Sequence, residues 1–95
     1  MASWGDVETY NNMISDLGTF CKDVKTSCGV MLSAANTCVQ MMEKDKASLE
    51  ASKKVALSIK QYEEATVLAE KLAKALEEER NDMIAYLRSI EDLED

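Results

Sequence analysis

The stretch VETYNNMISDLGTFCKDVKTSCGVMLSAANTCVQMM, residues 7–42, decides the fold. Alternating steps of three and four residues from its first position reach only apolar side chains: Val7, Tyr10, Ile14, Leu17, Cys21, Val24, Cys28, Met31, Ala35, Cys38 and Met42. A heptad repeat with two apolar positions is the contact line of a helix that packs lengthwise on another helix. We call this line the seam. It predicts a first helix over about residues 5–43.

A second helix is predicted over about residues 48–93, after a turn at about 44–47. The window from Glu43 to Ser48 is polar, and the seam changes phase across it. We therefore expect Asp45 or Ser48 to cap the second helix. The new seam is read through Val55, Ile59, Tyr62, Ala65 or Thr66, Ala69, Leu72, Leu76, Met83, Tyr86, Ile90 and Leu93. One continuous helix with a stutter is the alternative.

The first helix has an apolar arc that is wider than a plain two-stranded seam. Positions beside the seam are also apolar, on one side at Met13 and Phe20 and on the other at Leu32 and Val39. So broad an arc suits a helix with neighbours on two sides, as in a bundle. The residues predicted to contact a partner are Met13, Phe20, Cys28, Met31, Leu32, Ala35 and Val39.

The sequence therefore predicts an all-α protein with one domain over residues 1–95. The expected architecture is an antiparallel two-helix hairpin that pairs with another into a four-helix bundle. Ser3 and Asp6 have the spacing of a capping box, so a helix should start there. Trp4 lies at this start, either as a cap on the open end of the hairpin or as a contact surface for a partner.

Composition limits the class of partner. The chain of 95 residues has 18 Asp and Glu against 11 Lys and Arg and no basic stripe, so no nucleic-acid partner is expected. Residues 26–42 carry no charge, but they are too few and too rich in Ser, Asn, Thr and Gln to span a membrane. Residues 1–6 lack the basic and apolar regions of a signal peptide.

Residues that carry chemistry are scarce. The chain has no His, so the commonest general base and metal ligand are missing, and we expect no enzyme, cofactor or metal. Cys21, Cys28 and Cys38 lie on one helical stripe, too far apart for a disulfide within the helix. We interpret them as small buried side chains, with an intermolecular disulfide or a metal site as alternatives.

Acidic residues gather towards the end of the second helix. The seam is interrupted across residues 77–82, a run that would lie opposite residues 9–12 if the turn centres near residue 45. A solvated surface is one interpretation of this run, and a patch for a basic partner is the other. Residues 91–95 are acidic at the unfavourable end of the helix dipole, and such an end can serve as a recognition tag.

Two long antiparallel helices, an acidic charge, few aromatic residues and a tryptophan near the N-terminus resemble the small helical-hairpin proteins of bacterial type VII secretion. The WXG family has Trp-x-Gly in the turn and Tyr-x-x-x-Asp/Glu near the end of helix 2. Here Trp4 and Gly5 are adjacent at the other end, and Tyr86 is followed by Ile90 and then Glu91. The resemblance is therefore closer to the small partner proteins of LXG-type toxins, whose signals differ.

The resemblance implies a protein of the bacterial cytoplasm that pairs with the N-terminal domain of a larger effector and is exported without a cleavable signal peptide. Tyr86, Ile90 and Glu91 would then form the export or recognition tail. The leading hypothesis is a non-catalytic helical adaptor that binds another hairpin. The alternatives are a self-assembling coiled-coil scaffold and an acidic antitoxin or immunity protein.

Overall fold

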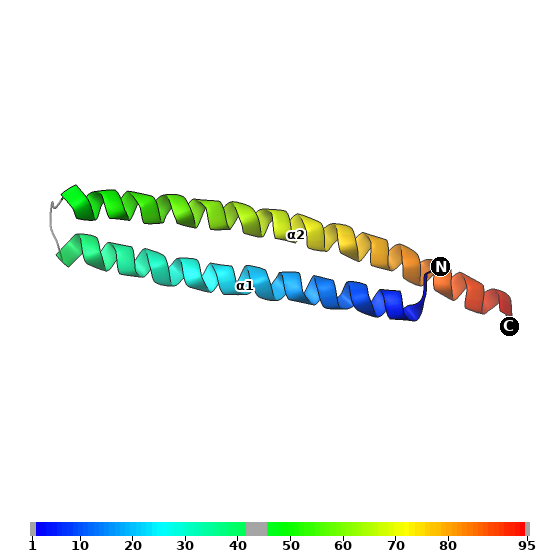
Figure 1. Cartoon of the computed structure of the whole chain (residues 1–95). Coiled ribbons are helices and arrows are strands. Elements are labelled where there is room, and N and C mark those ends of the chain that lie inside the picture. The colour runs from blue at the N-terminus through cyan, green and yellow to red at the C-terminus, as the bar shows by residue number, and fades with distance from the viewer. Residues whose placement is uncertain (1, 42–45, 95) are drawn as a thin grey trace. The chain divides into compact units, whose positions relative to one another are not determined.

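The computed structural model describes residues 2–41 and 46–94 and contains two helices in this part of the chain. Helix α1 covers Trp4–Met41 and helix α2 covers Lys46–Glu94, with no strand among the described residues. The two helices run antiparallel and pack against each other (Figure 1). This confirms the predicted all-α hairpin and excludes one continuous helix.

The predicted helix boundaries differ from the observed ones around the turn. Lys46 and Ala47 are already helical, so Ser48 lies inside α2 and the prediction that it caps this helix is wrong. The second predicted cap, Asp45, lies outside the described residues. The short polar window has no Gly or Pro that would mark a boundary, and its high content of helix-forming Lys and Ala allows α2 to begin early.

The start of α1 is held by the expected capping box. The backbone N–H of Asp6 donates to Ser3 Oγ at 3.2 Å, and the backbone N–H of Ser3 donates to Asp6 Oδ2 at 2.8 Å. Each side chain thus satisfies one of the N–H groups that a helix start leaves unpaired. The Asp6 carboxylate also lies where the helix dipole favours negative charge.

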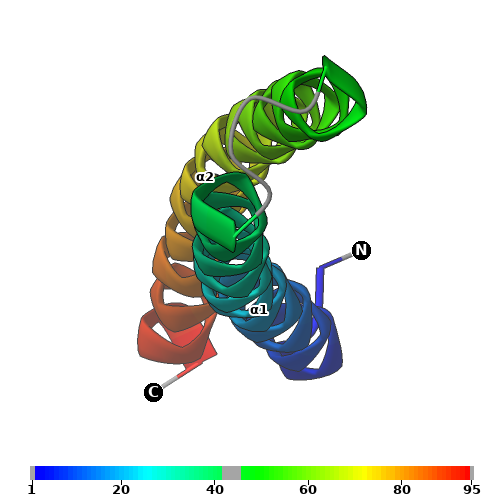
Figure 2. The ribbon, with the colours of Figure 1, turned by 90° about the vertical axis from the view of Figure 1, so that its left-hand side faces the viewer.

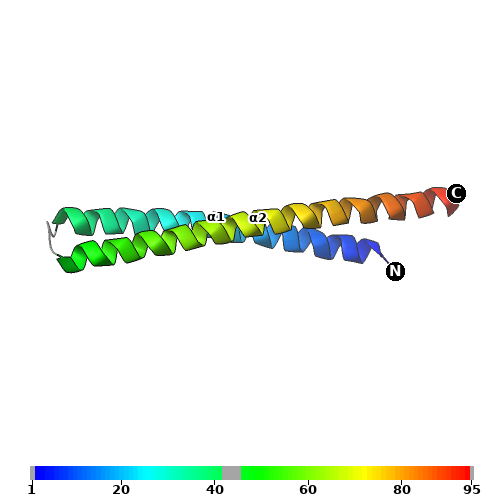
Figure 3. The same ribbon diagram turned by 90° about the horizontal axis from the view of Figure 1, so that it is seen from above.

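The chain divides into two compact units, each built from a segment of α1 and a segment of α2. The central unit extends from Phe20 to Val67, and Figure 2 views it from the end where α1 stops and α2 starts. The terminal unit combines the chain up to Thr19 with the chain from Leu68 onward. Its part of α2 continues past the start of α1 (Figure 3).

The central unit has a core of small and medium side chains. Cys21, Cys28, Ile59 and Thr66 are its buried residues. The Cys21 thiol donates to the backbone carbonyl of Thr66 at 3.7 Å, and the Thr66 hydroxyl donates to the backbone carbonyl of Glu63 at 2.7 Å. The buried hydroxyl therefore has a partner within its own helix, which removes most of the cost of burying it.

The terminal unit combines a small apolar core with polar contacts between the helices. Val7, Ala69 and Leu87 are its buried residues. The guanidinium of Arg80 donates from Nη1 to Asn11 Oδ1 at 2.9 Å. Polar side chains thus face each other where the sequence placed residues 77–82 opposite 9–12.

The seam of α2 differs from its prediction after Ala69. The seam is an unbroken heptad line in which only Tyr62 is exposed: Val55, Ile59, Tyr62, Thr66, Ala69, Ala73, Leu76, Arg80, Met83, Leu87 and Ile90. The predicted positions Leu72, Tyr86 and Leu93 are exposed. Arg80 keeps the seam in phase because its long apolar stem can lie along the contact while its charged end reaches Asn11.

The core that results is thin. The buried residues still keep 5–9% of their surface exposed, so no described side chain is fully enclosed. Thirteen large apolar side chains of the described residues are exposed, among them Val30, Leu68 and Leu93. Two helices can enclose a seam residue only from one side, which is why this fold leaves so much apolar surface in contact with solvent.

Replacing Arg80 with Leu should stabilise the hairpin. The change puts an apolar side chain on the seam and leaves Asn11, which is exposed, free to bind water. We expect the free energy of unfolding to rise by about 1 kcal/mol, measured by thermal unfolding followed by circular dichroism. Arg88→Leu, at an exposed position, is the matched control and should leave it nearly unchanged. A lower stability for Arg80→Leu than for the control would show that the Arg80–Asn11 contact outweighs apolar burial.

Candidate partner interface

The residues predicted to contact a partner fall into three groups in the structure. Cys28, Met31 and Ala35 lie on the seam of α1 and are buried or half-buried. Met13 and Phe20 lie on one side of that seam and are exposed at 38% and 44%. Leu32 and Val39 lie on the other side, exposed and half-buried respectively. Opposite edges of one helix cannot both be covered by the same single neighbouring helix.

Cys28 does not belong to an exposed interface. It is 8% exposed and lines the space between α1 and α2 in the central unit. Its seam position points it at the second helix of the same chain, so this residue of the predicted partner surface is an intramolecular core residue. The sequence does not distinguish these positions, because a wide apolar arc on one helix does not show which part of the arc the chain's own second helix covers.

One edge of the central unit carries two exposed aromatic side chains, and we call it the Phe20 flank. Phe20 of α1 and Tyr62 of α2 are 44% and 48% exposed. They line a hollow of about 360 Å³ together with Asp23, Val24, Ser27, Cys28 and Met31. Tyr62 occupies a seam position and is still half open to solvent, so the two helices do not close over this hollow.

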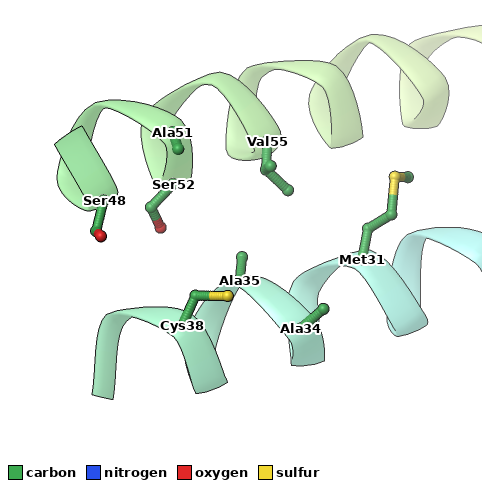
Figure 4. A pocket seen from close by; sticks show the side chains of 8 residues that line it. All are labelled: Met31, Ala34, Ala35, Cys38, Ser48, Ala51, Ser52 and Val55. Atoms are coloured by element: carbon green, nitrogen blue, oxygen red, sulfur yellow. The ribbon is translucent and has the colours of Figure 1, made fainter. Parts of the chain in front are cut away.

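The same flank continues into a second hollow, which we call the alanine hollow. It has a volume of about 330 Å³ and is lined by Met31, Ala34, Ala35 and Cys38 from α1 and by Ser48, Ala51, Ser52 and Val55 from α2 (Figure 4). Ala35 and Val55 point towards the opposite helix. Most of the lining side chains are too short to fill the space between the helices, so an apolar hollow remains open.

The opposite edge of the central unit, which we call the Leu32 flank, is also hollowed. Leu32 is 50% exposed, and with Val24, Gly29 and Ile59 it lines a space of about 210 Å³. A Cβ atom added at Gly29 would meet nothing within 4 Å. A glycine inside a helix costs about 1 kcal/mol relative to alanine, and no close approach by another described residue explains it.

The outer surface of α1 in the central unit is less polar than its composition suggests. Val30 is 65% exposed on this surface. The hydroxyls of Thr26 and Thr37 donate to the backbone carbonyls of Lys22 and Ser33, each at 3.0 Å. These hydroxyls are therefore already bonded within the helix, and their methyl groups add to the apolar surface.

The three cysteines differ in exposure. Cys21 and Cys28 are buried and Cys38 is exposed, so the interpretation of all three as buried side chains is wrong for Cys38. Cys38 lines the alanine hollow, where its neighbours are too small to cover it. Within residues 2–41 and 46–94, no group of three or more His, Cys, Asp or Glu side chains is arranged to hold a metal ion.

The candidate recognition tail lies at the end of α2. Tyr86 is 52% exposed, and Ile90 is half-buried on the seam. Glu91 Oε1 accepts a hydrogen bond of 2.8 Å from the indole Nε1 of Trp4. Trp4, which is 44% exposed, thus connects the start of α1 to the end of α2 and still offers part of its ring to solvent.

No helix in the described part of the chain is apolar over a length sufficient to cross a bilayer. In comparisons with known proteins, the chain matches no family model, no curated protein and no solved structure.

Thiol labelling of the native chain should distinguish the cysteines. At low chain concentration, Cys38 should react with a thiol reagent rapidly, while Cys21 and Cys28 should react only as the helices open. Mass spectrometry after a short reaction should therefore show one label per chain, and three after denaturation. Cys38→Ser should remove the rapid label. Rapid labelling of Cys21 or Cys28 would contradict their burial on the seam.

Proposed function

We propose that this protein is a non-catalytic helical partner protein that binds another helical chain. The observation that carries the proposal is the large amount of apolar surface that the protein exposes. No described side chain is fully enclosed, and thirteen large apolar side chains of the described residues are exposed. Isolated exposed apolar residues are ordinary, but rows of them along a hollowed edge are typical of interaction surfaces.

We further propose that the Leu32 flank receives this helical partner. Exposed Leu32 beside Gly29 offers an apolar side chain next to a position where a second backbone can approach closely. Lys25 and Glu63 line the same hollow and supply charges of both signs at its edge. An apolar centre with a polar rim is the usual composition of a protein–protein interface.

The biological setting follows from the resemblance to type VII secretion proteins. We propose that the partner is the helical targeting domain of a larger secreted effector, and that the complex presents a joint export signal. The exposure of Tyr86 supports its role in that signal, because a recognition residue has to be reachable. The Glu91 carboxylate accepts a hydrogen bond from Trp4, so both side chains would belong to that signal.

Placing a charge at Leu32 should abolish binding of the helical partner. The tagged chain is purified from its own host, a co-purifying protein is identified by mass spectrometry, and the complex is rebuilt from purified components. Leu32→Asp should weaken binding at least tenfold, because the interface would bury a carboxylate without a partner. Ser33→Asp adds the same charge to the neighbouring exposed residue and should bind normally. Equal affinities for the two variants would rule out the Leu32 flank as the binding surface.

Replacing Tyr86 should reduce export. In a host with type VII secretion, the amount of Tyr86→Ala in the culture medium should fall to the level of a cytoplasmic lysis marker, with the amount inside the cells unchanged. Arg88→Ala is the control, because Arg88 is also exposed and lies two residues away on α2. If Tyr86→Ala were exported as well as the wild-type chain, the proposed role of the tail would be wrong. If the wild-type chain were absent from the medium, the proposed export would be wrong.

A further inference from the structure

The Phe20 flank of the central unit has a shape that fits a copy of itself. Two exposed aromatic side chains, Phe20 and Tyr62, stand at one end of this flank. The alanine hollow lies at the other end, and Met31 lines both hollows. Ala34 lies two heptads after Phe20, so the aromatic end and the hollow end share one edge of α1.

We propose that a second copy of this chain covers the Phe20 flank, with the two copies related by a two-fold axis. In such an interface the same patch is used twice, so the aromatic end of each copy meets the alanine hollow of the other. An apolar cavity of about 150 Å³ already accepts a benzene molecule, and the hollow of about 330 Å³ therefore has room for an aromatic side chain. This inference rests on the proposed function, since it takes helical association as the mode of action.

The distribution of charge favours pairing through the central unit. Residues 20–67 contain seven Lys and Arg against six Asp and Glu, whereas the rest of the chain contains four against twelve. The central unit is thus nearly neutral, and the terminal unit carries eight excess negative charges. Two copies that met through their terminal units would repel each other, but pairing through the central units brings almost no net charge together.

The exposed area is sufficient for such an interface. The chain has an accessible surface of 7328 Å². A compact monomer of 10.6 kDa would expose about 5,500 Å², so roughly 1,800 Å² is in excess. A standard interface buries about 800 Å² on each partner. A dimer through the Phe20 flank would use part of the excess and leave the Leu32 flank for a different helical partner.

The test is the mass of the purified full chain in solution, measured by size exclusion with light scattering over a range of concentrations under reducing conditions. The wild-type chain should be a dimer that dissociates on dilution. Ala51→Glu puts a carboxylate into the alanine hollow and should weaken the dimer at least tenfold. Ala56→Glu, an identical change at an exposed position on the same helix that does not line this hollow, should leave the dimer intact.

A second pair of variants keeps the test decisive if Ala51→Glu loses helicity. Phe20→Ala removes the aromatic side chain without adding a charge and should also weaken the dimer at least tenfold. Leu57→Ala, at a residue of the central unit that is 59% exposed, should not. Labelling of Cys38, which lines the alanine hollow, should slow as the chain concentration rises, because the second copy covers it.

A wild-type chain that stays monomeric at every concentration, or that forms assemblies larger than a dimer, would overturn the inference. Equal dimerisation of the target and control variants would overturn it as well. The proposed function fails by a different result, namely no helical partner bound through Leu32. A monomer that still binds such a partner refutes only the dimer, and a dimer without another partner refutes only the adaptor function.

Discussion

A single line of contact between two helices is the constraint on which the rest of this structure depends. Each seam residue meets the other helix on one side only, and many of the seam positions hold small side chains such as Cys28, Ala35, Thr66 and Ala69. Even the buried residues therefore keep 5–9% of their surface exposed. Because apolar burial is the main favourable term in folding, a hairpin with so thin a core gains little from its own packing.

The same constraint explains why the two sides of α1 are apolar. A residue beside the seam is covered only if a third helix is present, so Phe20 and Leu32 remain exposed in the single chain. The two flanks lie on opposite edges and can receive different neighbours. The near-neutral central unit allows close approach of another helical chain, while the acidic terminal unit favours solubility and discourages contact with a like-charged copy.

The sequence predicted the hairpin and the seam of α1, because the apolar repeat is unbroken from Val7 and the capping box is local. The predicted seam of α2 was wrong where two adjacent apolar residues could each occupy the seam position. Tyr86 and Leu87 are both apolar, and only packing shows that Leu87 faces α1. Arg80 was predicted to lie in an interruption of the seam, because a heptad pattern of apolar residues cannot show that the apolar stem of an arginine continues it. The division of the interface residues into seam and flanks depends on where the second helix lies, which α1 alone does not specify.

The most direct test of the claim that this hairpin needs association is thermal unfolding by circular dichroism at several chain concentrations. Binding that favours the folded state raises the unfolding midpoint as concentration increases. The unfolding midpoint should rise steadily with chain concentration. A fully helical chain with the same midpoint at every concentration would contradict it, because its thin seam would then suffice for folding.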